Sequence, residues 1–195
     1  MLGSSILTCQ IGQCGNQLGQ AMYNSLIQES LGADLNHQLA TLSTYFHNDP
    51  KGGSQVRPSS LMIDMEPKVI DGILSQKEPF WGYDPKLTVC REEGSGNNWA
   101  FGFHLHGENC LSEILEKFNS LAERVDCVEG VVVLQSLAGG TGSGVGSRVL
   151  EELRNVLGSK PIFSIAVLPR LSGEVILQFY NAVFSLANLY NVRSC

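Results

Sequence analysis

Short apolar runs alternate with longer stretches at helical spacing along the chain. Runs at residues 5–10, 61–64, 87–90, 131–134 and 161–168 have the length and the β-branched content of strands. Apolar residues recur at intervals of three and four from residue 16, over 67–75, 108–126, 145–157 and 175–191, and these stretches are predicted to be helices. Residues 31–60 are polar and rich in Gly, Asn, His and Pro, so they predict a long, mobile loop.

Strands that alternate with helices predict a parallel sheet with right-handed crossovers. The runs at 131–134 and 161–168 are continuously apolar, as in strands that are buried on both faces. The expected fold class is α/β, a Rossmann-like parallel sheet with helices on both faces. Ligands in such folds bind at the carboxyl ends of the strands, so the loops that follow the strands are the places to look for chemistry.

Composition narrows the class of protein further. The apolar content of 43% and charged content of 16% are those of a globular domain. A net charge of -6 gives no reason to expect nucleic acid or an anionic membrane as a partner. No run of about 18 apolar residues and no basic, apolar leader are present, and the six cysteines contain no CxxC pair. These features favour a reducing cytosol with free thiols.

The glycine-rich segment at residues 136–144, SLAGGTGSG, has the most distinctive chemistry. It lies between a predicted buried strand and a predicted helix, and its glycines allow the backbone N–H groups to turn towards an anion. The positive end of the following helix adds to this, so the segment predicts a phosphate cradle. It has no lysine and fits neither GxxxxGK[ST] nor GxGxxG. The alternative is a flexible turn.

Three other loops leave predicted strand ends. Residues 12–17, GQCGNQ, combine small glycines with amide side chains, although Asn16 could simply cap a helix. Asp64 and Glu66 could hold Mg²⁺ through water, or could cap and charge the start of a helix. Residues 94–99, GSGNNW, suggest left-handed positions near an anion, or an ordinary turn above Trp99. The histidines form no metal or catalytic set with trusted spacing.

These four loops, taken in order, resemble the tubulin family over nearly the whole chain. The resemblance rests on QIGQCGNQ at 10–17, DMEP at 64–67, GNNWA at 96–100 and AGGTGSG at 138–144, where Ala138 replaces a glycine usual in alpha and beta chains. The segments DMEPKVI, GSGNNWA, AGGTGSG and GEVI are most similar to delta-type members. The resemblance implies a nucleotide-binding domain over residues 1–191 and a divergent tail at 192–195, and it implies that the domain stops before its last strand.

The resemblance also implies a site for GTP and Mg²⁺. Its expected nucleotide-binding residues are Gly12, Gln13, Cys14, Gln17, Gly96, Asn97, Ser136, Ala138, Gly139, Gly140, Thr141, Gly142, Ser143, Gly144 and Glu174. Among these, Gly96 and Asn97 would approach the terminal phosphate and Glu174 the ribose. Glu66 would lie near the Mg²⁺. The family hydrolyses GTP on assembly, but its base-reading elements and catalytic acid would lie beyond Cys195, so no catalytic residue is assigned here.

The function implied by the resemblance is that of a GTP-binding cytoskeletal subunit in the cytoplasm, at centrioles, basal bodies or cilia. Other tubulin subunits, microtubules and tubulin-folding chaperones are the implied partners. Two alternatives stay open. A nucleotide-dependent oxidoreductase is disfavoured because GxGxxG does not follow the first strand. A truncated interaction fragment that neither turns over GTP nor polymerises would retain the same motifs.

Overall fold

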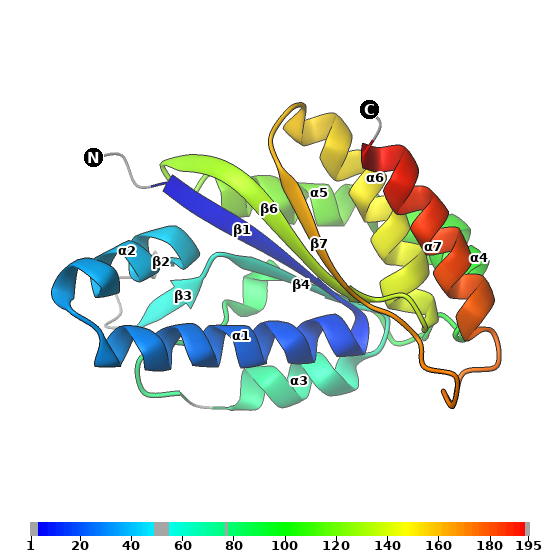
Figure 1. Ribbon diagram of the computed structural model, residues 1–195, viewed down its shortest axis with the longest axis horizontal. Coiled ribbons are helices and arrows are strands. Elements are labelled where there is room, and N and C mark those ends of the chain that lie inside the picture. Colours follow the sequence, from blue (N-terminus) through cyan, green and yellow to red (C-terminus); the bar gives the residue numbers. More distant parts are fainter. Residues whose placement is uncertain (1–3, 49–54, 77, 194–195) are drawn as a thin grey trace.

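A parallel sheet of five strands forms the centre of the protein. The computed structural model describes residues 4–48, 55–76 and 78–193 (Figure 1). The sheet has the order β5-β4-β1-β6-β7. Its strands are β1 (Ser4–Ile11), β4 (Ser60–Asp64), β5 (Thr88–Cys90), β6 (Cys127–Ser136) and β7 (Ile162–Val167). All neighbouring pairs are parallel, as the alternation of strand and helix predicts.

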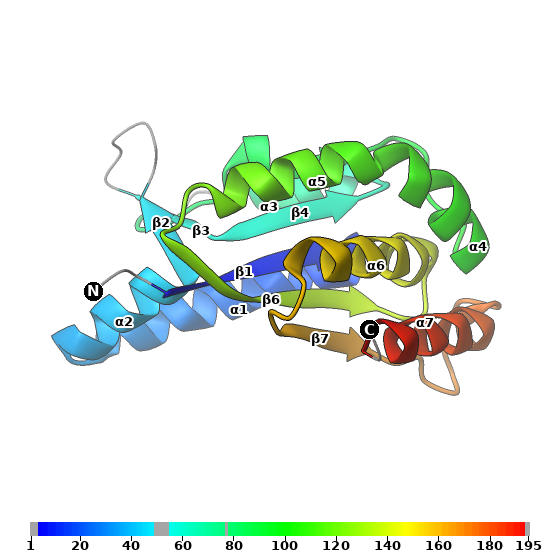
Figure 2. The same ribbon diagram turned by 90° about the horizontal axis from the view of Figure 1, so that it is seen from above.

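Helices lie on both faces of this sheet (Figure 2). They are α1 (Gly12–Gly32), α2 (Leu35–Tyr45), α3 (Pro67–Ser75), α4 (Trp99–Phe101), α5 (Glu108–Ala122), α6 (Gly146–Leu157) and α7 (Gln178–Arg193). Two π-helical turns, η2 (Gly102–Gly107) and η3 (Thr141–Val145), and a 3-10 turn, η1 (Pro85–Leu87), complete the helical elements. The α/β fold class predicted from the sequence is confirmed.

Each face of the sheet has its own core. Leu61 and Ile63 of β4 face α5 and α6, where Phe118 and Leu150 are almost fully buried. Met62, between them in the strand, faces the other way and packs in a cluster with Tyr23 of α1. This alternation follows from the two-residue period of a strand. At about 25 cal/mol per Å² of buried apolar surface, these two cores are the main source of the domain's stability.

The strand register brings the carboxyl ends of four strands to one edge. Ile11 at the end of β1 pairs with Ile63 of β4 and with Gln135 of β6, and Asp64 at the end of β4 pairs with Cys90 of β5. The segments that follow β1, β4, β5 and β6 therefore leave the sheet close together. These are the four segments in which the sequence predicted chemistry.

The prediction of a long loop at residues 31–60 is wrong. It contains α2 and a two-stranded antiparallel sheet of β2 (Phe46–Asn48) and β3 (Val56–Pro58), while residues 49–54 lie outside the described part of the chain. Asp34 caps α2 by accepting a hydrogen bond from the His37 N–H at 3.0 Å. Leu35, Leu39 and Leu42 of α2 do stand at helical spacing, a signal that the prediction from the overall composition of the segment overlooked.

Several boundaries also differ from the prediction. The first helix begins at Gly12 rather than at Asn16, so Asn16 is not its cap. Half of the glycine-rich segment is already helical, because η3 begins at Thr141. The last helix begins at Gln178 instead of residue 175. The helix predicted over 108–126 ends at Ala122, where hydrogen bonds of the final turn tighten.

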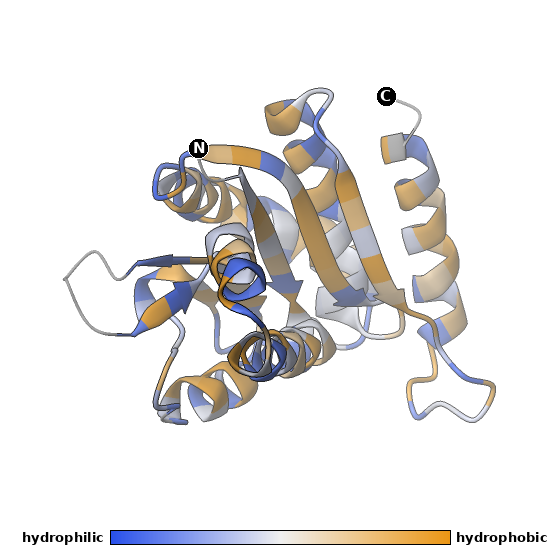
Figure 3. Cartoon of the chain, turned by 60° about the vertical axis from the view of Figure 1, so that its left-hand side comes forward, coloured by the Kyte–Doolittle hydropathy of each residue, from blue (hydrophilic) through white to orange (hydrophobic). Residues whose placement is uncertain are grey.

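The strand β7 is less covered than its apolar sequence predicted. Phe163, Ile165 and Val167 are all exposed, on the strand positions that alternate with the partly buried Ile162. In α7 the large apolar residues Phe179, Val183 and Leu186 are also exposed, and the hydrophobic colouring of both elements can be followed in Figure 3. Among the described residues, no helix has the length and apolar character needed to cross a bilayer.

Candidate functional site

A cavity of about 830 Å³ opens where the strands end, and we call it the strand-end cavity. Segments after β1, β4, β5 and β6 all contribute to its walls. The sequence-predicted residues that line it are Gly12, Gln13, Cys14, Gln17, Glu66, Gly96, Asn97, Ser136, Ala138, Gly139, Gly140, Thr141 and Gly142. Such a volume falls within the range of small-molecule sites.

The start of α1 forms one wall. Gly12 has a φ of +74°, and a β-carbon there would lie 3.0 Å from the Gly142 backbone nitrogen, so glycine is required on both counts. Because α1 begins here, its first N–H groups and the positive end of its dipole face the cavity edge. Gln13 and Gln17 are exposed along this wall, and burial raises the pKa of the half-buried Cys14 thiol, so the thiol stays protonated at neutral pH.

The glycine-rich segment forms the opposite wall, and its glycines serve close packing. A β-carbon on Gly140 would lie 2.7 Å from the Ser95 Cβ, and one on Gly142 would lie 2.6 Å from the Ser136 carbonyl oxygen. Neither glycine has a positive φ. Gly139 differs, because its added β-carbon would meet only the Asn97 Oδ1, at 3.5 Å. Gly139 is thus the point where this backbone is open to the cavity.

Side-chain hydrogen bonds hold this wall in shape. The Ala138 N–H donates to the Ser136 Oγ at 3.2 Å, and the Ser143 hydroxyl donates back to the Gly139 carbonyl. Ser143 is fully buried, and it does not line the cavity; the same holds for Gly144, which packs against Gly102 and Trp99. These two predicted residues therefore sit behind the wall.

The segment after β5 supplies the left-handed turn that its glycines and asparagines suggested. Gly96 has a φ of +55° and Asn97, which is not a glycine, has a φ of +52°. Asn98 then caps the following helical turn, accepting hydrogen bonds from the N–H groups of Ala100 and Phe101. Ser95 shares a hydrogen bond of 3.1 Å with the Thr141 hydroxyl, which ties this turn to the glycine-rich wall.

Two carboxylates reach the cavity from the end of β4. Asp64 is 4% exposed; its Oδ1 accepts the Met65 N–H at 2.8 Å, while its Oδ2 is buried without a partner. Burial is the main cause that raises the pKa of Asp64 to about 6. Glu66 is exposed and lies against Gly94, where a β-carbon would come 2.4 Å from its carboxylate.

This pair fits a cation that brings further oxygen ligands with it. No group of three or more His, Cys, Asp or Glu side chains is gathered for a metal anywhere in residues 4–48, 55–76 and 78–193. Mg²⁺ commonly binds through one or two carboxylates, waters and the phosphates of its nucleotide. A buried carboxylate oxygen without a partner is the kind of atom such an ion would satisfy.

The structure differs from the sequence-based site at several residues. Glu174, expected at the ribose, is exposed and does not line the cavity, whereas its neighbour Val175 does. Asp64, which the sequence offered with Glu66 as a possible Mg²⁺ residue but which the resemblance did not assign, lines the cavity, and so does Ser95, which was not predicted although it lies in the GSGNNW motif. Asn181 of α7 was missed entirely; it supports two of the walls from behind.

Comparison with known proteins places this arrangement in a family. The family described as "Tubulin/FtsZ family, GTPase domain" matches residues 5–195. A tubulin delta chain of Mus musculus is 34% identical over 95% of this chain and 43% of its own length. A tubulin gamma chain of Saccharomyces cerevisiae is 35% identical over 96% of this chain and 41% of its own length. A human tubulin beta-1 chain is 34% identical over 97% of this chain and 44% of its own length.

The chain thus spans less than half the length of these relatives, and the shared part is their nucleotide-domain segment. The match extends over all four cavity walls, and it leaves the oxidoreductase alternative without support. On the fold and on these similarities, the chain belongs to the Tubulin/FtsZ family and carries its GTPase domain.

Proposed function

We propose that this chain binds GTP with Mg²⁺ in the strand-end cavity, as the nucleotide-binding part of a tubulin-type cytoskeletal subunit. The observation that supports this most is the meeting of two glycine-bearing segments and a buried, unpartnered carboxylate oxygen on one cavity. Helix starts and tightly turned backbone favour phosphate, and the carboxylates favour its counter-ion.

In this proposal the phosphates lie between two walls. Backbone N–H groups around Ala138–Gly142 and at the start of α1 bind phosphate oxygens, and Ser136 stands at the base of the wall. Gly96 and Asn97 approach the terminal phosphate, since their left-handed turn exposes backbone at the cavity. Gln13, Cys14 and Gln17 cover the nucleotide from the α1 side. Glu174 would have to move towards the ribose from its exposed place on the rim.

Asp64 and Glu66 would hold the Mg²⁺. The cation supplies charge neutralisation for the phosphates when it is bound. For its own part, the chain supplies a carboxylate whose burial already disfavours the charged form, so a bound cation would compensate that cost and keep Asp64 ionised. Glu66, which is exposed, can reach the ion through a bound water.

The similarity to delta chains extends the proposal to biology. We propose a delta-like role in organising microtubules at centrioles, basal bodies or cilia, within the cytoplasm and cytoskeleton. Other tubulin subunits or microtubules would be its partners, and tubulin-folding chaperones would assist its folding. Support comes from the four curated delta chains that match at 33–35% identity. An alternative role as an interaction fragment without GTP turnover makes a different prediction in the following test.

Titration calorimetry of the chain with nucleotides and Mg²⁺ tests the proposal. We expect GTP to bind in an Mg²⁺-dependent manner and GMP to bind at least about tenfold more weakly, because the walls described here recognise phosphates. ATP should bind nearly as well as GTP, since no described wall residue reads the base. Equal affinities for GTP and GMP would contradict the phosphate site. Absence of any binding would favour the interaction-fragment alternative.

A further inference from the structure

A stripe of buried polar side chains runs along the inner side of α7. The stripe comprises Gln178, Asn181, Ser185 and Asn188, each at most 8% exposed. Its spacing of three, four and three residues keeps all four on one helical face. Helices normally bury apolar residues, so a polar inner face calls for hydrogen-bond partners, which the side-chain nitrogens and hydroxyl of this stripe have.

Asn181 makes the most consequential set of these contacts. Its amide nitrogen donates to the Asn97 carbonyl at 2.8 Å and to the Ala138 carbonyl at 2.7 Å. Its Oδ1 accepts the Trp99 N–H at 2.9 Å. One side chain, 2% exposed, thereby joins the turn after β5 to the glycine-rich wall after β6. Both walls line the strand-end cavity, but Asn181 itself does not.

We propose that Asn181 is a positioning residue for the nucleotide site, which fixes the distance between the two walls that face the terminal phosphate. The predicted effect of Asn181 on nucleotide binding rests on the proposed function. Asn181 acts through the backbone of Asn97 and Ala138 and touches no nucleotide. A pre-set spacing lowers the cost of ordering the walls around a ligand.

The chemistry of an asparagine side chain is required at this place. Both N–H donors are used, and the amide oxygen accepts one hydrogen bond, so the contacts need donors and an acceptor on one planar group. Aspartate has the same shape but would set a carboxylate oxygen against two carbonyl oxygens. Alanine would leave two buried carbonyls and one N–H without this partner, which is costly in a dry site.

The same helix links the walls to the rest of the domain. One turn further along, the Ser185 hydroxyl donates to the Ser143 carbonyl at 3.2 Å, behind the glycine-rich wall. A displacement of either wall on contact with a terminal phosphate would therefore be passed to α7. We expect the consequence of losing Asn181 to be greater for a triphosphate than for a diphosphate, because Gly96 and Asn97 lie where the terminal phosphate is proposed.

Asn181→Ala and Asn181→Asp test this, with Asn188→Ala as the matched control. Asn188 is the same residue type, is buried on the same stripe, and bonds Glu151 of α6 away from both walls. Calorimetry with Mg²⁺ compares GTP and GDP affinities. In Asn181→Ala and Asn181→Asp, GTP affinity should fall roughly ten- to a hundredfold and GDP affinity by less. Asn188→Ala should leave the ratio of GTP to GDP affinity unchanged.

A second readout needs no nucleotide. Amide hydrogen exchange of the Trp99 N–H in the unliganded chain should accelerate at least about tenfold in Asn181→Ala and not in Asn188→Ala, because only the first loses its acceptor. If wild type binds GTP and Asn181→Ala binds it with an unchanged GTP to GDP ratio, this inference is overturned while the proposed function stands. If wild type binds no nucleotide, the proposed function fails, and unchanged Trp99 exchange would then overturn the linkage itself.

Discussion

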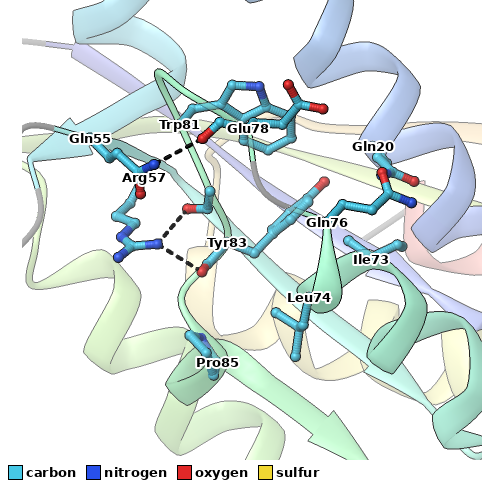
Figure 4. A pocket seen from close by; sticks show the side chains of 11 residues that line it. Gln20, Gln55, Arg57, Ile73, Leu74, Gln76, Glu78, Trp81, Tyr83 and Pro85 are labelled. Carbon is cyan, nitrogen blue, oxygen red and sulfur yellow. Dashed lines mark hydrogen bonds between the residues drawn. The ribbon is translucent and has the colours of Figure 1, made fainter.

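Two cavities of this domain differ in what their walls are made of. The strand-end cavity, about 830 Å³, is bordered by glycine backbone, three residues with positive φ (Gly12, Gly96 and Asn97) and a buried carboxylate oxygen without a partner. The second, which we call the α3 pocket, measures about 420 Å³ and lies among α3, β3 and residues 78–85 (Figure 4). It is lined by side chains such as Arg57, Trp81 and Tyr83.

The polar groups around the α3 pocket already have partners. Arg57 donates to the carbonyls of Gly82 and Tyr83 at 3.1 and 3.0 Å, and Gln55 donates to the Glu78 carbonyl at 2.8 Å (Figure 4). Among the described residues that line it, none carries a buried nitrogen or oxygen without a hydrogen bond. The left-handed Asn97 and the unsatisfied carboxylate oxygen therefore support the proposal of a ligand site at the strand-end cavity, and the α3 pocket offers no comparable feature among its described residues.

The largest expected difference between the two cavities comes from Gly140→Val. The new side chain would overlap Ser95 and the Asn98 backbone and drive the two walls apart. We expect nucleotide binding to fall more than about a hundredfold, and Gly142→Val, which meets the Ser136 backbone, to behave alike. Calorimetry measures this, and Gly32→Val, which meets nothing within 4 Å, is the control. Unchanged affinity in Gly140→Val would remove this wall from the site.

A substitution in the α3 pocket should lower the stability of the fold and leave nucleotide affinity nearly unchanged. Trp81 is 4% exposed and packs edge-on against Tyr83, with ring centroids 5.3 Å apart. Trp81→Ala should lower the free energy of unfolding by about 3–5 kcal/mol, as other buried aromatic truncations do. Denaturant unfolding measures the loss. Nucleotide affinity below the melting temperature should stay within about twofold, and a large selective loss of affinity would make the α3 pocket part of the site.

Asp64→Asn should separate stability from binding at the strand-end cavity. Mg²⁺-dependent GTP affinity should fall about tenfold, because a carboxylate charge close to the cation is lost. The unliganded variant should be more stable than wild type at pH 7.5 by about 1–2 kcal/mol, since burying the charged form of Asp64 is unfavourable. Lower stability together with unchanged Mg²⁺ dependence would show that Asp64 is a structural residue.

The smallest effect concerns pH. A pKa of about 6 for Asp64 in the folded chain lies above the ordinary value of 3.8, so between these values the folded state binds more protons than the unfolded state. Protonation of Asp64 therefore stabilises the folded state below pH 4, and this stabilisation is lost as the pH rises through 6. The difference in unfolding free energy, Asp64→Asn minus wild type, should therefore grow from pH 4 to pH 7. A flat difference would contradict the raised pKa.

The sequence could predict the sheet because strands and helices alternate with different apolar periods. It could also predict that the four motif-bearing segments meet, because parallel strands bring the segments that follow them to one edge. The prediction missed α2, although Leu35, Leu39 and Leu42 follow helical spacing and Asp34 precedes them as a capping residue. It also overstated the burial of β7, because an apolar run does not reveal which neighbours cover it.

The roles of single residues in the site needed coordinates. The glycines of residues 136–144 indicated a tight turn, but Gly140 is required by its contact with Ser95, a residue 45 positions earlier. Asn181 could have been noticed as a member of a polar stripe within an apolar helix, yet its partners Asn97 and Ala138 lie far away in the sequence. Long-range packing of this kind has no local signal.

Hydrogen exchange with and without Mg²⁺ and GTP is the most direct test of where the nucleotide binds. We predict protection of amides in residues 94–99 and 136–145 at saturating nucleotide, because both walls close on the phosphates. Residues 78–85 of the α3 pocket should exchange at the same rate in both states. Protection confined to residues 78–85, with the two walls unchanged, would contradict the account.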